Sequence, residues 1–186
     1  MTFFEFIRNA FPGLRKNFLK DDSGVTAVEF AFVSVPFFAL LFAIIETSLV
    51  YFNQQALDAS TFSAARAVMT SNTTTQTAFY CSICPRPSDS CASSPTTILP
   101  STFNCQRLIV DVQNYANFNG TPGTSSTPPA TPTFSPGGTG TVNVVRVYYP
   151  MPVYLSFLIG NMSPRTKDSS GNWTHNLFSI SVFVME

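Results

Sequence analysis

The chain has 186 residues, of which only 11% are charged, and its formal net charge at pH 7 is zero. Nucleic-acid binding depends on clustered lysine and arginine, so this balance argues against nucleic acid as a partner. The 19 Phe and 14 Pro favour short strands and loops beside a membrane segment over a helical enzyme.

Residues 1–24 form a short cationic leader. Its charged residues are basic at four positions and acidic at three: Arg8, Arg15, Lys16 and Lys20 against Glu5, Asp21 and Asp22. The next basic residue after the following apolar segment is Arg66. This asymmetry predicts a cytoplasmic N-terminus and an extracytoplasmic remainder.

Residues 25–52 are almost entirely apolar and predict a membrane-spanning helix. At about 1.5 Å per residue the segment would be roughly 42 Å long, whereas the hydrocarbon core of a bilayer is about 30 Å thick. A buried helix of a soluble core is the alternative, and the apolar character on every face disfavours it. Glu29 and Glu46 are expected near the two edges of the hydrocarbon.

Two interpretations of Glu29 are open. In the first, both glutamates are interfacial acids that are solvated at the edge of the bilayer. In the second, the chain is cut after Gly24, which gives Val25 a free α-ammonium one helical turn from the Glu29 carboxylate. The carboxylate would then pair with the amine of its own or a neighbouring subunit. The spacing favours this second interpretation.

The sequence around this position is Gly24-Val-Thr-Ala-Val-Glu29-Phe30, and it follows a basic leader. It resembles the prepilin-peptidase signal of type IV pilins, in the version of the Flp-type subclass. The continuation, with Pro36, Ile45-Glu46 and Asn53-Gln-Gln-Ala56, resembles the TadE-like minor pseudopilins of the tight-adherence pilus. The resemblance is dense over residues 23–70.

The resemblance implies cleavage between Gly24 and Val25 by a prepilin peptidase, with Glu29 and Phe30 acting in assembly and charge pairing. It implies a minor pilus subunit of the bacterial inner membrane, which acts in initiation or assembly of the pilus and so in surface adherence, with or without entry into the fibre. The implied partners are the inner membrane, the peptidase, a TadF-like minor pseudopilin and, as a further candidate, the major Flp pilin.

A function from another class stays open. The chain could be a single-pass, membrane-anchored extracytoplasmic binding module that is not processed, in which case the Gly24 motif is accidental. Phosphate-binding glycine loops, nucleophile elbows and metal-ligand signatures are not recognisable in the sequence. We therefore expect no enzyme, no cofactor and no metal site. His175, in a polar stretch, is expected to be a solvated loop histidine.

Residues 53–70 predict a stalk helix that continues the membrane segment. The stretch is rich in Ala and lacks Gly and Pro, so we expect one helix from about Val25 to Met69, with a kink at Pro36. Its apolar stripe consists of Leu57, Ala64 and Val68. Its small residues, among them Ala59 and Ser63, could pack on another helix or on the protein's own sheet.

The four cysteines, Cys81, Cys84, Cys91 and Cys105, predict two disulfides. Their spacing contains one zinc-like pair that is not repeated, and an extracytoplasmic compartment is oxidising. Three pairings are possible. The Cys81–Cys84 pairing is the least comfortable because it closes a very small ring.

Three stretches of alternating apolar residues predict strands at residues 106–113, 141–149 and 177–185. Residues 119–141, rich in Gly, Pro, Ser and Thr, predict a long mobile loop. Residues 150–160 are expected either to pack beneath the sheet or to contact the membrane or a partner. The expected fold is α+β, with residues 71–186 as the extracytoplasmic domain. It is a pilin-like lollipop in which one long helix packs on a small antiparallel sheet with disulfide-stapled loops.

Overall fold

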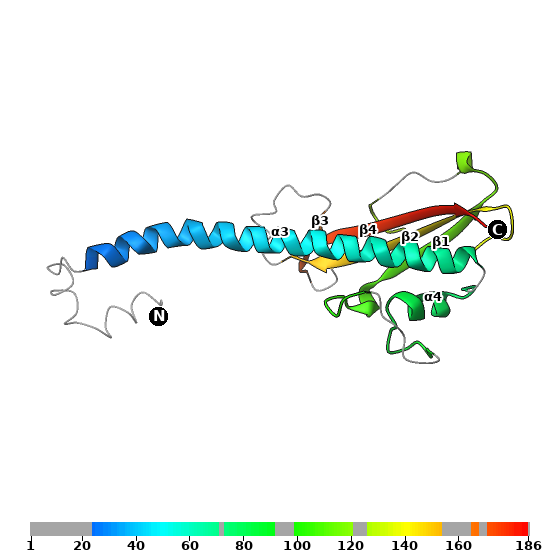
Figure 1. Ribbon diagram of the computed structural model, residues 1–186, viewed down its shortest axis with the longest axis horizontal. Coiled ribbons are helices and arrows are strands. Elements are labelled where there is room, and N and C mark those ends of the chain that lie inside the picture. Colours follow the sequence, from blue (N-terminus) through cyan, green and yellow to red (C-terminus); the bar gives the residue numbers. More distant parts are fainter. Residues whose placement is uncertain are drawn as a thin grey trace. The chain divides into compact units, whose positions relative to one another are not determined.

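The computed structural model describes residues 24–70, 73–91, 99–120, 126–153, 165–167 and 171–185 (Figure 1). The predicted leader lies outside these residues apart from Gly24. The chain divides into two compact units, Met1–Ile44 and Ile45–Glu186.

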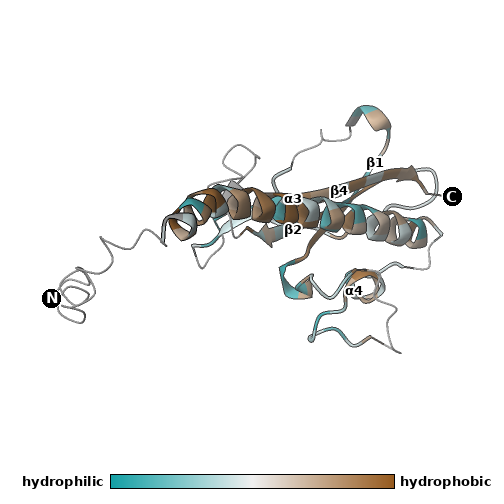
Figure 2. Cartoon of the chain, turned by 60° about the vertical axis from the view of Figure 1, so that its left-hand side comes forward, coloured by the Kyte–Doolittle hydropathy of each residue, from teal (hydrophilic) through white to brown (hydrophobic). Residues whose placement is uncertain are grey.

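Helix α3 extends from Val25 to Met69, as the sequence predicted. Its 45 residues contain no glycine, and Pro36 is the single proline within it. The hydroxyl of Ser34 donates to the carbonyl of Ala31 at 3.0 Å in the turn before this proline. By length and composition the helix can cross a membrane, and its most apolar stretch is not buried by the protein. Figure 2 shows the hydrophobic colours concentrated toward the N-terminal half of α3.

The second unit contains a four-stranded antiparallel sheet with the order β1-β2-β4-β3. The strands are β1 (Ile109–Tyr115), β2 (Val142–Pro152), β3 (Arg165–Lys167) and β4 (Trp173–Val184). The three predicted strands are present with shifted ends: β1 begins after a 3-10 helix at Cys105–Arg107, β2 extends to Pro152, and β4 starts four residues before the predicted Leu177. The segment 150–160 therefore begins as part of β2, and its residues 154–160 lie outside the described residues. Strand β3 is additional and too short to show an alternating pattern in the sequence.

The core lies between the sheet and residues 45–69 of α3. The predicted stripe of the stalk is fully buried there, with Leu57 at 0%, Ala64 at 2% and Val68 at 0% exposure. The sheet contributes alternate side chains to the same core: Val110, Val112, Val145, Val147, Tyr149 and Leu177. The helix-on-sheet arrangement confirms the predicted α+β class. Among the small stalk residues, Ser60 is buried against this core, whereas Ala59 and Ser63 are exposed.

The face of β4 that points toward the core is mixed, with Leu177 and Phe183 beside two serines, whereas the face that points away is apolar. Leu177, Ser179 and Ser181 are buried. The alternate residues Val182 and Val184 are 44% and 41% exposed. An alternating strand is therefore present as expected, but its more apolar face is the outer one.

The prediction of a mobile loop over residues 119–141 is wrong for much of that range. Val112 in β1 donates to the Thr133 carbonyl at 2.7 Å and accepts from the Ser135 amide at 2.8 Å. The ring of Phe134 packs edge-on against Phe79, with centroids 5.8 Å apart. The ring of Phe134 and two backbone hydrogen bonds thus hold residues 133–135 along the edge of β1. Residues 121–125 lie outside the described part.

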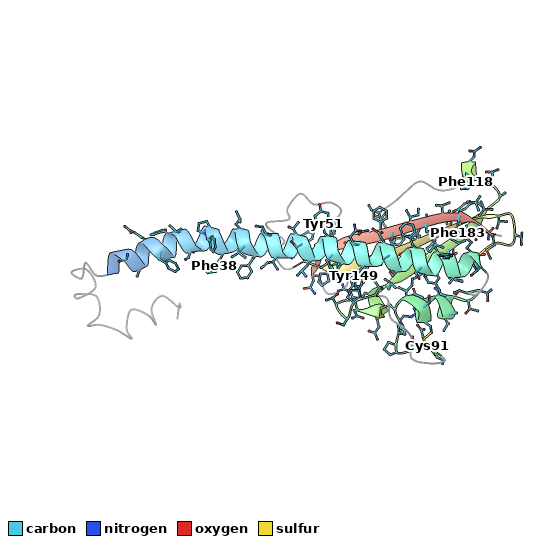
Figure 3. All side chains as sticks on the ribbon, viewed as in Figure 1. Phe38, Tyr51, Cys91, Phe118, Tyr149 and Phe183 are labelled. Atoms are coloured by element: carbon cyan, nitrogen blue, oxygen red, sulfur yellow. A yellow bond between two sulfur atoms is a disulfide. The ribbon has the colours of Figure 1, made fainter. Side chains whose placement is uncertain are left out.

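A short helix, α4 (Gln76–Ile83), follows the stalk and was not anticipated from the sequence. Thr75 caps it, because its hydroxyl accepts a hydrogen bond from the Ala78 amide at 3.3 Å. Two disulfides join Cys81 to Cys91 and Cys84 to Cys105, with Cα atoms 5.6 and 5.4 Å apart. The prediction of two disulfides is confirmed, and the pairing left open by the sequence is resolved. Figure 3 labels Cys91 at this stapled region.

Candidate functional site

The first candidate site is the N-terminal end of α3, where the predicted cleavage site lies. The helix begins at Val25, directly after Gly24. A Cβ atom added at Gly24 would meet no atom within 4 Å, and the backbone there is not in the left-handed region. The fold described here therefore does not require glycine at this position.

Glu29 and Phe30 lie in the second turn of the same helix. Both side chains are exposed, Phe30 by 70%. Further along, the exposed side chains of Ala31, Phe32, Val35 and Pro36 lie together on one apolar face of the helix. Figure 3 shows the side chain of Phe38 projecting from the helix in this region. The helix thus offers an apolar surface that lipid or another helix could cover.

Glu46, the second predicted interfacial acid, lies in the domain unit and is only 8% exposed. Val50, one turn further, and Asn53 are buried as well. The Thr102 hydroxyl donates to Oδ1 of Asn53 at 3.1 Å, which ties the helix to the loop before β1. Packing of the domain on α3 therefore starts within the segment predicted to cross the membrane.

The sheet contains a buried ion pair that the sequence analysis missed. Nε and Nη2 of Arg146 in β2 lie 3.0 and 2.6 Å from Oδ2 of Asp111 in β1. The other carboxylate oxygen, Oδ1, accepts from the amide of Thr133 at 2.9 Å. Asp111 is 0% and Arg146 8% exposed. Asp111 therefore links the loop at Thr133 to both β1 and β2. Its signal in the sequence is one acid and one base at mid-strand positions that face each other in register.

A second candidate site is a groove of about 390 Å³ between α3 and β4. Gln54, Asp58 and Phe62 line it from the helix, and His175, Ser179 and Ile180 are among its residues from the strand. The prediction that His175 is a solvated loop residue is wrong, because it lies in β4, half-buried. Burial lowers its pKa from the usual 6.5. Nδ1 of His175 and Oγ of Ser179 are buried without a hydrogen-bond partner.

The cysteines are structural. All four cysteines are engaged in disulfides. Within the described ranges, no group of three or more His, Cys, Asp or Glu side chains is placed to hold a metal ion.

These features define a class: an α+β protein whose apolar N-terminal helix can span a membrane once and continues into a disulfide-bonded domain. The family model described as TadE-like protein matches residues 24–78. The match covers α3 and the start of α4, so this part of the chain is TadE-like and is consistent with a component of the Tad pilus system. Comparisons with curated proteins and with solved structures give no significant match.

Proposed function

We propose that the chain is the precursor of a minor pseudopilin of a tight-adherence type IV pilus. A prepilin peptidase cuts it between Gly24 and Val25, and the mature protein acts in initiation or assembly of the pilus and so in surface adherence. The observation that carries the proposal is a TadE-like match that starts at a glycine which the fold does not need.

Gly24 supports cleavage because a Cβ atom at this position would meet open space. A glycine that meets neither a close neighbour nor a left-handed backbone is unexplained by packing. Recognition by a peptidase supplies a reason, since the absence of a side chain lets another backbone approach closely.

Glu29 supports an assembly role for the mature helix. Cleavage would leave the α-ammonium of Val25 at the positive end of the helix dipole, in a membrane of low dielectric constant. An unpaired charge is costly there, and an exposed carboxylate one turn away can offset it in its own or in an adjacent subunit. The apolar face at Pro36 would then lie against a neighbouring helix.

The proposal places residues 1–24 in the cytoplasm, the segment 25–52 across the bacterial inner membrane and residues 71–186 outside it. The excess of basic residues in the leader supports this orientation. The proposed partners are the prepilin peptidase, a TadF-like pseudopilin and the major Flp pilin. The role is structural, without a catalytic site or cofactor.

The experiment that tests the proposal compares two glycine variants in cells that carry the peptidase. Gly24→Val changes the cleavage position, whereas Gly138→Val is a matched control, because a side chain at Gly138 also meets open space. We expect the Gly24 variant to accumulate as the longer precursor and the Gly138 variant to be shortened normally. Equal shortening of both variants would contradict cleavage at this site.

The alternative function, an unprocessed membrane-anchored binding module, is favoured by the groove between α3 and β4. This module would keep its leader in the native protein. A native chain that starts at Met1 in the presence of the peptidase would favour it over the pseudopilin.

A further inference from the structure

Among the described residues, only strand β3 pairs with the edge of β4 that faces away from β2, and it reaches residues 173–175, so the rest of this edge is open in that part of the structure. On the β2 side, Trp173 accepts from Val153, and Met185 exchanges hydrogen bonds with Thr141 and Gly140. The odd-numbered residues of β4 therefore bond toward β2. Successive residues of an antiparallel strand bond in opposite directions. The even-numbered residues thus direct their backbone N–H and C=O groups toward the open edge.

A side chain of α3 already forms a hydrogen bond with one of these edge groups, whereas others lack such a bond among the described residues. Nε2 of Gln54 donates to the Phe178 carbonyl at 2.9 Å. Within the part of the chain that the structure describes, Ile180 and Val182 make no such hydrogen bond on this side. Unpaired edge groups of this kind are a template for an added strand.

The groove lies directly beside this edge, with α3 as its other wall. Figures 1 and 2 both show β4 running along the domain part of α3. Ser179, only 3% exposed, lines the groove, and its hydroxyl has no partner. A buried polar atom without a hydrogen bond is costly, so a ligand that supplies one is favoured here.

The groove also has a charge preference. Among the described residues that line the groove, Asp58 is the one with a charged side chain, and both of its carboxylate oxygens lie 3.2 Å from Nε2 of Gln54. His175 is neutral at pH 7, since burial lowers its pKa. A segment bound beside Asp58 would therefore gain from a lysine or arginine side chain facing the helix.

A second copy of this chain does not fit the edge. Strand β4 runs in the same direction as α3, since Gln54 meets Phe178 and Asp58 and Phe62 share the groove with Ser179 and Ile180. Two β4 strands paired about a twofold axis are antiparallel, so the two α3 helices would point in opposite directions and could not enter one membrane. A parallel arrangement would need the other edge of the sheet, where Val112 already pairs with Thr133 and Ser135.

We infer that the edge of β4 and the adjoining groove bind an extended segment of a different protein, which adds to the sheet as a further strand beside Ile180 and Val182. On the face of the bound segment that points toward α3, a lysine or arginine side chain faces Asp58. On the opposite face, its side chains are apolar, like Ile180 and Val182 of β4. The inference rests on the membrane anchoring in the proposed function and extends it by assigning a partner surface.

The test places a photocrosslinking amino acid at Phe62, an exposed groove residue, in the full chain in native membranes. Val182→Pro removes an edge N–H without removing a hydrogen bond to β2. Val182→Thr keeps the N–H and the side-chain shape. We expect a cross-link to a different protein that falls at least tenfold, by roughly the 1.4 kcal/mol of one edge contact, in the proline variant and persists in the threonine variant.

A second pair of variants keeps the test decisive if the proline variant fails to fold. Asp58→Lys reverses the charge of the groove wall, whereas Gln55→Lys places the same lysine side chain at an exposed position of α3 that is not among the groove residues. Loss of the cross-link in the first variant alone supports the inference. Equal cross-linking in both pairs, or a cross-link only between two differently tagged copies, overturns it. The N-terminus of the same sample reports separately on processing, so failure of one proposal is distinguishable from failure of the other.

Discussion

Asp111 of β1 and Arg146 of β2 form an ion pair inside the sheet, with Nη2 and Oδ2 2.6 Å apart. Removal of one partner would leave the other charge buried without compensation. We expect Asp111→Asn to lower the free energy of unfolding by about 3–5 kcal/mol. Replacement of both residues, Asp111→Leu with Arg146→Met, should recover part of this loss, because no charge stays buried but the Thr133 amide loses its acceptor. Chemical denaturation of the purified protein measures both effects.

The control for this prediction is the ion pair between Arg86 and Asp89, with Nε and Oδ2 3.1 Å apart. The Asp89 side chain is 5% exposed, but that of Arg86 is 28% exposed, against 10% for Arg146, so water reaches Arg86 more readily when its partner is removed. Asp89→Asn should therefore cost less than Asp111→Asn, by about 1 kcal/mol or more. A loss as large as that of Asp111→Asn would contradict the account of the buried pair.

The two disulfides should contribute unequally to stability. The bridge between Cys84 and Cys105 spans 21 residues, and Cys84 is buried in the core; the bridge between Cys81 and Cys91 spans 10. Removing either should cost about 3 kcal/mol, because the denatured chain gains entropy. Replacing both Cys84 and Cys105 by Ala should cost more than replacing Cys81 and Cys91, by about 0.7 kcal/mol from loop length alone and further from lost core packing. The urea concentrations at the unfolding midpoints of the two variants measure which bridge contributes more. A greater loss on removal of the bridge between Cys81 and Cys91 would contradict the prediction.

His175 predicts a pH dependence of stability. Burial lowers its pKa in the folded protein, so the unfolded chain takes up a proton at a higher pH than the folded one. The contribution of the neutral His175 side chain to the free energy of unfolding is therefore fully present above about pH 6.5. It decreases as the pH falls below that value. Asp58 lines the same groove and is retained in the comparison. His175→Gln should lose less stability between pH 7 and pH 5 than the unmodified protein. An identical loss in the two proteins would exclude the effect.

Glu29 predicts a separation of membrane insertion from assembly. The apolar helix should insert with or without this carboxylate, whereas the amine exposed by cleavage would lose its partner in Glu29→Ala. We expect normal membrane content and at least about tenfold fewer pili, the effect of roughly 1.4 kcal/mol. Thr26→Ala, at another exposed polar position of the same helix end, is the control. Normal piliation in the Glu29 variant would argue against charge pairing.

Helices and strands that follow a regular pattern of residues could be predicted well from the sequence. The helix of α3 from Val25 to Met69 follows from a long stretch without glycine, and its buried stripe follows from the spacing of Leu57, Ala64 and Val68. The main strands follow from alternation, and two disulfides follow from four cysteines in an expected oxidising compartment. In each case, local residue types decide the structure.

Features that depend on long-range pairing could not be predicted in this way. The loop around Phe134 is rich in Gly, Pro, Ser and Thr, and it is held by contacts with Phe79 and β1 that no local pattern reveals. The pairing of Asp111 with Arg146 requires the strand register. The polar neighbours of His175 predict a loop. In the structure, β4 begins before this residue and its side chain is half-buried.

The central claim is that the chain is processed like a pilin, and the N-terminus of the native protein tests it most directly. The protein would be purified from native membranes of a strain with the prepilin peptidase and of a strain without it, and its first residues would be determined by mass spectrometry. The account predicts a start at Val25 with the peptidase and at Met1 without it. A start at Met1 in both strains would contradict the claim.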